Sequence, residues 1–155
     1  MRFLARPHHL PARIATGAYI LNSGLTKLDA DEQTAAGVHG MAAGSYPFLK
    51  RLDPERFTKL LAMAEISLGT ALILPVVPTA LAGAALTAFG AGLLGLYLRT
   101  PGLRRPGDIR PTPEGVGVAK DVWLVGIGLS MLIDECAGGS PAGTRRSSVA
   151  RRRRR

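Results

Sequence analysis

Four ionisable residues stand inside, or at the ends of, apolar stretches of this chain: Lys27, Glu65, Lys120 and Asp121. Glu65 belongs to LLAMAEISLGTALILPVV, in which it is the one charged residue. A carboxylate in hydrocarbon is costly unless it is protonated or a cation pairs with it. Such a group can relay protons or bind a polar part of a ligand. It therefore marks a candidate functional site.

The partner of Glu65 is expected to be a lysine, either Lys27 or Lys120. The residues alone leave that choice open, and they also leave open what the pair does. A polar contact of this kind can serve chemistry, or it can simply hold helices together.

Four apolar segments can position these groups, at residues 12–28, 59–74, 78–98 and 116–133. About 20 apolar residues cross a bilayer as a helix. We therefore expect an all-α fold, an integral membrane four-helix bundle formed by residues 1–137, followed by a disordered Arg-rich tail in 138–155. Two alternatives were weighed: a buried helix of a soluble protein at 78–98, and a signal peptide at 12–28.

Antiparallel spans place the end of the first segment and the starts of the second and fourth in one leaflet. Lys27 ends the first segment, and Glu65 lies about 9 Å below the start of the second. Helical spacing then predicts which faces converge on this cluster, because small and polar residues recur there every three, four or seven positions. The supporting residues are Thr16, Ser23, Ala62, Gly69 and Gly128. A separate series, Ala84, Ala88 and Gly92, is expected to pack within the bundle.

The net charge of +9 is concentrated at the C-terminal end of the chain. We expect these tail arginines to contact anionic lipid headgroups, with RNA as the runner-up: Arg151, Arg152, Arg153, Arg154 and Arg155. A nucleic-acid-binding surface across the fold is not expected. Cys136 is the single cysteine, which excludes an internal disulfide or a CxxC redox pair.

The connections indicate the topology. PVVP at residues 75–78 is a tight reversal that predicts an antiparallel hairpin, Asp53-Pro54 reads as a helix start, and residues 99–115 read as a loop. Lysines and arginines are equally numerous on the two sides of the bundle. Arg6 and Arg13 flank the first span, and this favours cytoplasmic N- and C-termini.

The order of these features resembles the DoxX family of small four-helix membrane proteins. The likeness is carried by ARIATGAYILNSGLTKL, AGSYPFL, AEISLGTALILP and AKDVWLVGIGLSML, which together touch most of residues 12–133. The resemblance implies a bacterial inner-membrane protein. It also implies a link to redox complexes, since some relatives are associated with thiosulfate:quinone oxidoreductase and others with superoxide dismutase and a sulfurtransferase.

Three functions follow as hypotheses. The first is a non-catalytic membrane subunit or scaffold that recruits a soluble redox partner, because the sequence carries no motif for independent catalysis. The second is a quinone-binding subunit in which Glu65 relays protons. The third is a small-solute transporter, which would require a homo-oligomer. No cofactor is predicted beyond a possible quinone, and no metal site is predicted. His8, His9 and His39 are expected outside the spans, so a haem held by two histidines is not expected. His39 is expected in a loop, with a metal or quinone role as the alternative.

Overall fold

The computed structural model describes residues 5–138, and this part of the chain is helical, with no strand. The long helices are α1 (Leu10–Leu28), α2 (Glu32–Ser45), α3 (Pro54–Ile73), α4 (Thr79–Arg99) and α6 (Val122–Gly138). The short ones are η1 (Pro7–His9), η2 (Pro47–Arg51) and α5 (Val116–Ala119). The expected all-α class is confirmed for the described residues.

Two helical segments are long and apolar enough to cross a membrane: α4, and the stretch Val116–Ala137 that contains α5 and α6. Both coincide with expected spans. The segments expected at 12–28 and 59–74 also form helices, α1 and α3, but neither passes the same test of hydropathy. The reason is their polar content, since α1 carries Arg13 and Lys27 and α3 carries a charged first turn and Glu65.

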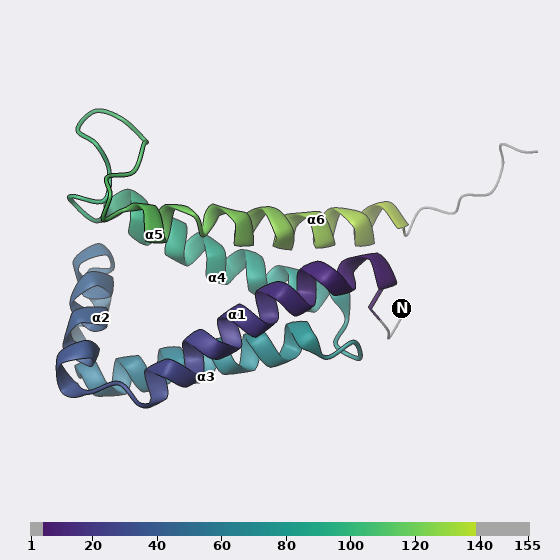
Figure 1. Cartoon of the computed structure of the whole chain (residues 1–155), viewed down its shortest axis with the longest axis horizontal. Helices are drawn as coiled ribbons and strands as arrows, with labels where there is room; N and C mark the ends of the chain where they lie inside the picture. The colour runs from purple at the N-terminus through teal and green to yellow at the C-terminus, as the bar shows by residue number, and fades with distance from the viewer. Residues whose placement is uncertain (1–4, 139–155) are drawn as a thin grey trace, which may run out of the picture.

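The long helices are arranged as two closely packed pairs, α1 with α3 and α4 with α6. The pairs lie near each other at the end of the molecule that holds the N-terminal segment, and they diverge toward the end where α2 lies (Figure 1). The turn at residues 75–78 reverses the chain between α3 and α4, as the sequence predicted. These two consecutive helices nevertheless share few contacts, because α3 packs mainly against α1 and α4 packs mainly against α6.

Small residues allow α1 and α3 to approach closely. A methyl group added at Gly69 would lie 2.6 Å from the backbone nitrogen of Leu21 and 2.7 Å from the carbonyl oxygen of Gly17. Gly24 makes a similar contact, with its added Cβ 2.8 Å from the carbonyl oxygen of Ala62. The small face predicted for α3 therefore does lie against another helix.

The α4–α6 pair uses the same device at different positions from those predicted. Cβ atoms added at Gly83 or Gly128 would meet the backbone of the other helix, at 3.1 Å and 2.8 Å. Ala84, Ala88 and Gly92, the series expected to pack within the bundle, are exposed instead. That prediction was wrong because α4 has small residues on more than one face, so spacing alone could not identify the face used.

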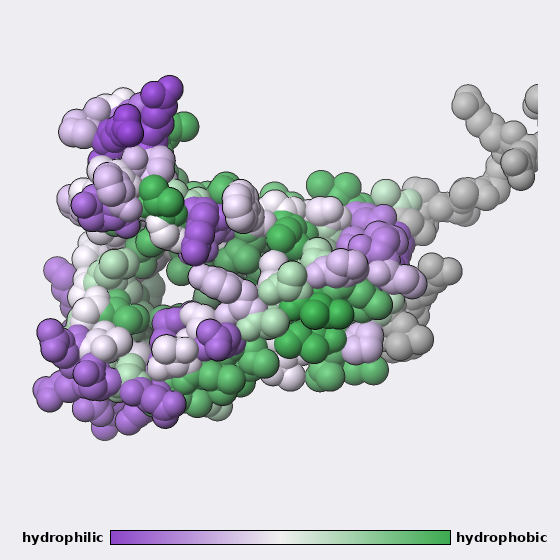
Figure 2. All heavy atoms as spheres, viewed as in Figure 1, coloured by the Kyte–Doolittle hydropathy of each residue, from purple (hydrophilic) through white to green (hydrophobic). Residues whose placement is uncertain are grey.

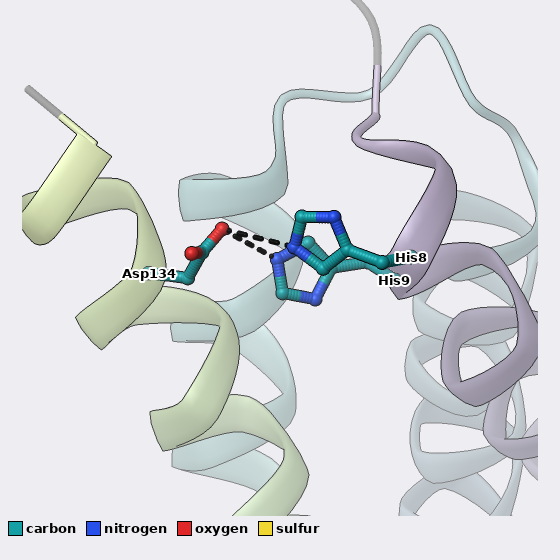
Figure 3. Close-up of side chains that lie close together, drawn as sticks. All are labelled: His8, His9 and Asp134. Atoms are coloured by element: carbon teal, nitrogen blue, oxygen red, sulfur yellow. Dashed lines mark hydrogen bonds and ion pairs between the residues drawn. The ribbon is translucent and has the colours of Figure 1, made fainter.

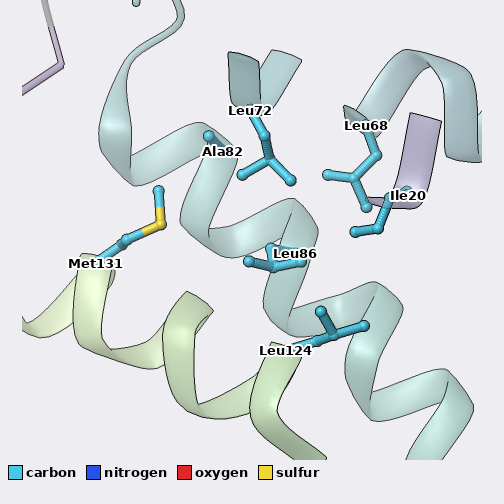
Figure 4. Close-up of a cluster of buried hydrophobic side chains, with 7 residues drawn as sticks. All are labelled: Ile20, Leu68, Leu72, Ala82, Leu86, Leu124 and Met131. Carbon is cyan, nitrogen blue, oxygen red and sulfur yellow. The ribbon is translucent and has the colours of Figure 1, made fainter. Parts of the chain in front are cut away.

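The hydrophobic core lies where the two pairs meet, and its side chains come from α1, α3, α4 and α6 (Figure 4). Its buried members are Ile20, Leu68, Leu72, Ala82, Leu86, Leu124 and Met131. Many other large apolar side chains point outward, among them Leu60, Leu81 and Trp123, which are 61 %, 63 % and 71 % exposed. Hydrophilic residues gather at the end of the molecule formed by α2 and the 100–115 loop (Figure 2). Exposed apolar surface of this extent is typical of a region that contacts a membrane or another protein.

Helix α2 lies between the first two expected spans, in a part of the chain where the sequence predicts no span. Its N-terminus is capped by Asp31, whose carboxylate accepts a hydrogen bond from the backbone N–H of Thr34 at 2.8 Å. The hydrogen bonds with Thr34 hold the pKa of Asp31 below its usual value. The predicted start of α3 is confirmed, because Asp53 caps that helix through the N–H of Arg56.

Arg13 is fully buried and joins α1 to the end of α3. Its guanidinium donates hydrogen bonds to the carbonyl oxygens of Ala71, Leu72 and Leu74 at 2.8–3.0 Å. It also reaches Val77 in the turn that leads to α4. The last carbonyls of a helix have no partner within the helix, so Arg13 supplies the missing donors. The sequence had treated Arg13 as a flanking charge, and the structure corrects this.

Candidate functional site

Glu65 and Lys27 form an ion pair between α3 and α1. The Lys27 ammonium lies 2.8 Å and 3.0 Å from the two carboxylate oxygens of Glu65. The Glu65 side chain is 6 % exposed and the Lys27 side chain 21 % exposed. Lys27 also donates to the hydroxyl oxygen of Ser23 at 2.6 Å. The Lys27 ammonium thus neutralises the buried carboxylate and offsets the free-energy cost of removing it from water.

Lys120 does not take part in this pair. Its ammonium lies 5.4 Å from the centre of the Tyr19 ring, an arrangement typical of a cation–π contact. Asp121 follows Lys120 at the break between α5 and α6 and lies near Glu65 without touching it. The helix expected from 116 to 133 is therefore interrupted at these two residues. Of the four clustered groups, the structure brings Lys27 and Glu65 into contact and places Asp121 in the same cavity wall.

A cavity of about 520 Å³ opens between the diverging helix pairs, and it underlies the hollow beside α2 in Figure 2. Ser23, Lys27, Glu65, Asp121 and Thr34 supply its polar groups. The rest of the wall is mostly apolar, with side chains from all the long helices. Small-molecule sites have this size and this mixture of an apolar wall with a few polar groups.

The five supporting residues separate into different roles. Ser23 belongs to the site, since it lines the cavity and contacts Lys27. Ala62 and Gly69 lie in the α1–α3 contact, and Gly128 lies against α4. Thr16 donates to the carbonyl oxygen of Ala12 one turn earlier in α1 and lines a smaller adjoining cavity. None of these four residues lines the cavity beside the ion pair: three lie in helix–helix contacts, and Thr16 lines the adjoining cavity.

The polar groups around the ion pair can form hydrogen bonds with a ligand in the cavity. The Ser23 hydroxyl oxygen accepts from Lys27, so its own O–H can donate into the cavity. The carboxylate oxygens of Glu65 can accept hydrogen bonds. A ligand with carbonyl or hydroxyl oxygens on an apolar ring would match both the wall and these groups.

A second charged cluster lies at the other end of the molecule, where η1 meets the last turns of α6. His8 and His9 contact the carboxylate of Asp134 (Figure 3), and the Arg6 guanidinium contacts it as well. The sequence analysis missed this cluster. An even number of antiparallel helices brings the two ends of the bundle together, so HH at the start and Asp134-Glu135 at the end were an available signal.

Arg151 to Arg155, expected to contact lipid headgroups, lie outside the described residues. Comparison of the chain with models of protein families, with curated proteins and with solved structures finds no match.

Proposed function

We propose that this chain is a four-helix membrane protein that binds a quinone-type ligand in the cavity beside Lys27 and Glu65, as the membrane subunit of a redox complex. The observation that carries the proposal is the buried ion pair in the wall of an apolar cavity of ligand size. The DoxX-like pattern of the sequence agrees with this role. A bacterial inner membrane is the expected location.

Whether the whole bundle can span a membrane depends on α1 and α3, because α4 and residues 116–137 are already apolar enough to do so. Helices of 19 and 20 residues, α1 and α3, are about 28–30 Å long, which matches the hydrocarbon core. Arg13, Lys27 and Glu65 have partners within the protein, whereas Glu55, Arg56 and Lys59 are exposed in the first two turns of α3. The outward residues that follow in α3 include Leu60 and Met63, 61 % and 56 % exposed. These helices could therefore cross beside α4 and α6 with the three exposed charges of α3 at the membrane surface.

The proposed chemistry assigns binding and proton transfer to this chain. Reduction of a quinone consumes protons as well as electrons, and the electrons would come from a soluble redox partner. Ser23 would donate to a quinone oxygen, and Glu65 would pass a proton toward it. Lys27 would hold the resulting carboxylate.

The test is to purify the protein from native membranes in mild detergent and to measure extracted quinone by mass spectrometry. Wild-type protein should retain quinone. Val38→Trp, which adds a bulky ring to the cavity wall, should lose it, whereas Leu60→Trp on the outward face of α3 should not. Equal quinone in the Val38 variant, or none in the wild type, would contradict the proposal.

A non-catalytic scaffold is the second candidate, favoured by the loop at residues 100–115. This loop is folded against the end of α4, with the Tyr97 hydroxyl donating to the carbonyl oxygen of Ile109 at 2.6 Å. Arg105 and Arg110 are exposed on it. A scaffold would copurify with a soluble redox protein without quinone, would tolerate Glu65→Gln, and would lose its partner when Arg105 and Arg110 are replaced by Ser.

A further inference from the structure

Three side chains of kinds that bind metals converge at the end of the molecule away from the cavity. His8 and His9 stand in η1, and Asp134 stands near the end of α6. The Nε2 atoms lie 3.3 Å (His8) and 3.0 Å (His9) from the same carboxylate oxygen, and the three ligand atoms all lie within 4.8 Å of one another. Figure 3 shows both imidazoles turned toward the carboxylate.

The spacing suits a divalent cation of the zinc type. Bonds of about 2.0–2.1 Å to imidazole nitrogen or carboxylate oxygen in a tetrahedron place neighbouring ligand atoms about 3.3 Å apart. His9 is 7 % exposed and its ring is held in place by packing, whereas the His8 side chain is 61 % exposed. One fixed and one accessible imidazole leave a route for a cation to enter from solvent.

Arg6 competes for the same carboxylate. Its guanidinium contacts the Asp134 oxygen that both histidines approach, and its Nε lies 3.6 Å from a carboxylate oxygen of Glu135. A metal cation and a guanidinium would repel each other at this oxygen. Entry of the metal would therefore shift Arg6 from Asp134 to Glu135, which is already within ion-pair distance.

We propose that His8, His9 and Asp134 form a binding site for a divalent cation such as Zn²⁺, which the cation occupies in exchange with the Arg6 guanidinium. The bound metal would join the segment before α1 to the end of α6, two parts of the chain far apart in sequence. The site is separate from the cavity, so it does not depend on the function proposed above.

The test uses the full-length protein in detergent, with any polyhistidine tag removed. Co²⁺ is the probe, since its visible absorption reports tetrahedral coordination by nitrogen and oxygen, and Zn²⁺ is then added in competition. One equivalent of Co²⁺ should bind and Zn²⁺ should displace it. His8→Ala and Asp134→Asn should weaken binding by about tenfold or more, whereas His39→Gln, in α2, should leave it unchanged.

The Arg6→Gln variant tests the exchange, because the two possible roles of Arg6 predict different changes in Co²⁺ affinity. If the guanidinium competes with the metal, its removal tightens Co²⁺ binding, whereas a structural role for Arg6 predicts weaker or equal binding. Helix content of each variant, measured by circular dichroism, separates loss of the site from loss of the fold. The proposal is overturned if folded wild-type protein binds no Co²⁺, or if His8→Ala and Asp134→Asn bind it as the wild type does.

Discussion

Buried charges in this protein are stabilised in two different ways. Glu65 has a single opposite charge, Lys27, on the neighbouring helix. Arg13 has no acidic partner among residues 5–138, and its guanidinium donates to backbone carbonyls at the end of α3 instead. The first arrangement lines a cavity, where a ligand could reach it, whereas the second joins α1 to the end of α3 and holds the fold together.

Removal of Lys27 should be costly because it leaves the buried Glu65 carboxylate without a partner. We expect Lys27→Met to lower the free energy of unfolding by about 3 kcal/mol. Glu65→Gln in the same chain should restore much of that loss, since no charge then remains. The measurement is unfolding of the purified protein by a denaturing detergent. Lys120→Met is the matched control, and a loss from it equal to that of Lys27→Met would contradict the pairing.

Arg13 should be the most sensitive arginine in the described chain. Arg13→Ala removes the donors for the last carbonyls of α3, and we expect a loss of about 3 kcal/mol in the same unfolding assay. Arg13→Lys keeps the charge, but the lysine ammonium cannot bond to several carbonyls at once. Its free energy of unfolding should therefore lie between those of the wild type and Arg13→Ala. Arg51→Ala, at an exposed position, should be neutral within about 0.5 kcal/mol. A small effect at Arg13 would show that water satisfies these carbonyls.

At the scale of helices, much of the fold was predictable from the sequence. Apolar length predicted α4, and Asp53-Pro54 predicted the start of α3. Helix α2 could not be predicted in this way, because its alanines and glycines show no clear apolar face. The break between α5 and α6 at Lys120 and Asp121 could not be predicted either, because apolar residues continue on both sides of it.

The pairing of helices was harder to predict than the helices themselves. Because a short turn connects α3 to α4, the order of the helices in the chain predicts that these two pack together. The small residues, which allow backbones to approach closely, instead favour packing of α3 on α1. Only the second choice brings Gly69 opposite Gly17 and places Glu65 within reach of Lys27. Several faces of α4 carry small residues, so composition could not decide its partner. Lys27, Glu65, Asp121 and Ser23 were thus predictable as residues of one site, whereas the cavity and the position of Lys120 over Tyr19 were not.

The α1–α3 contact should be the most sensitive to added volume. Gly69→Ala places a methyl group against the backbone of Leu21, which cannot move as a side chain can. We expect a loss of about 1–3 kcal/mol in the free energy of unfolding. Gly92→Ala is the control, because nothing lies near that position and alanine favours the helix. It should be neutral or stabilising; equal losses in both variants would mean that Gly69 is not in a tight contact.

For the whole molecule, the divergence of two helix pairs has two consequences. It opens the cavity at the end closed by α2, and it brings the N-terminal segment, the end of α6 and the turn after α3 together at the other end. Ala5 donates to the carbonyl oxygen of Pro75 there at 2.8 Å. The proposed bundle therefore has one side with the start of α1 and the end of α6, and one side with α2 and the 100–115 loop.

The orientation of these two sides should depend on the arginine tail. Arg13 is buried against carbonyls and Arg6 is paired with Asp134, so neither is the simple flanking charge that the sequence suggested. Residues 145–155 come after α6 in the sequence and carry seven arginines, which would add positive charge to the side where α6 ends. We therefore expect them to hold that side in the cytoplasm. A chain that ends at residue 138 should lose this preference and insert partly or wholly in the opposite sense.

Cys136 makes this measurable, because it is the single cysteine, is exposed near the end of α6 and remains in the shortened chain. A thiol reagent that does not cross membranes should label it in inside-out vesicles for the full chain, but not in intact cells. The shortened chain should be labelled from the outside as well. Replacement of the tail arginines by lysine should preserve the orientation, since the charge is kept, whereas replacement by glutamine should act like the deletion. Labelling of the full chain in intact cells would place the termini outside and overturn the assignment.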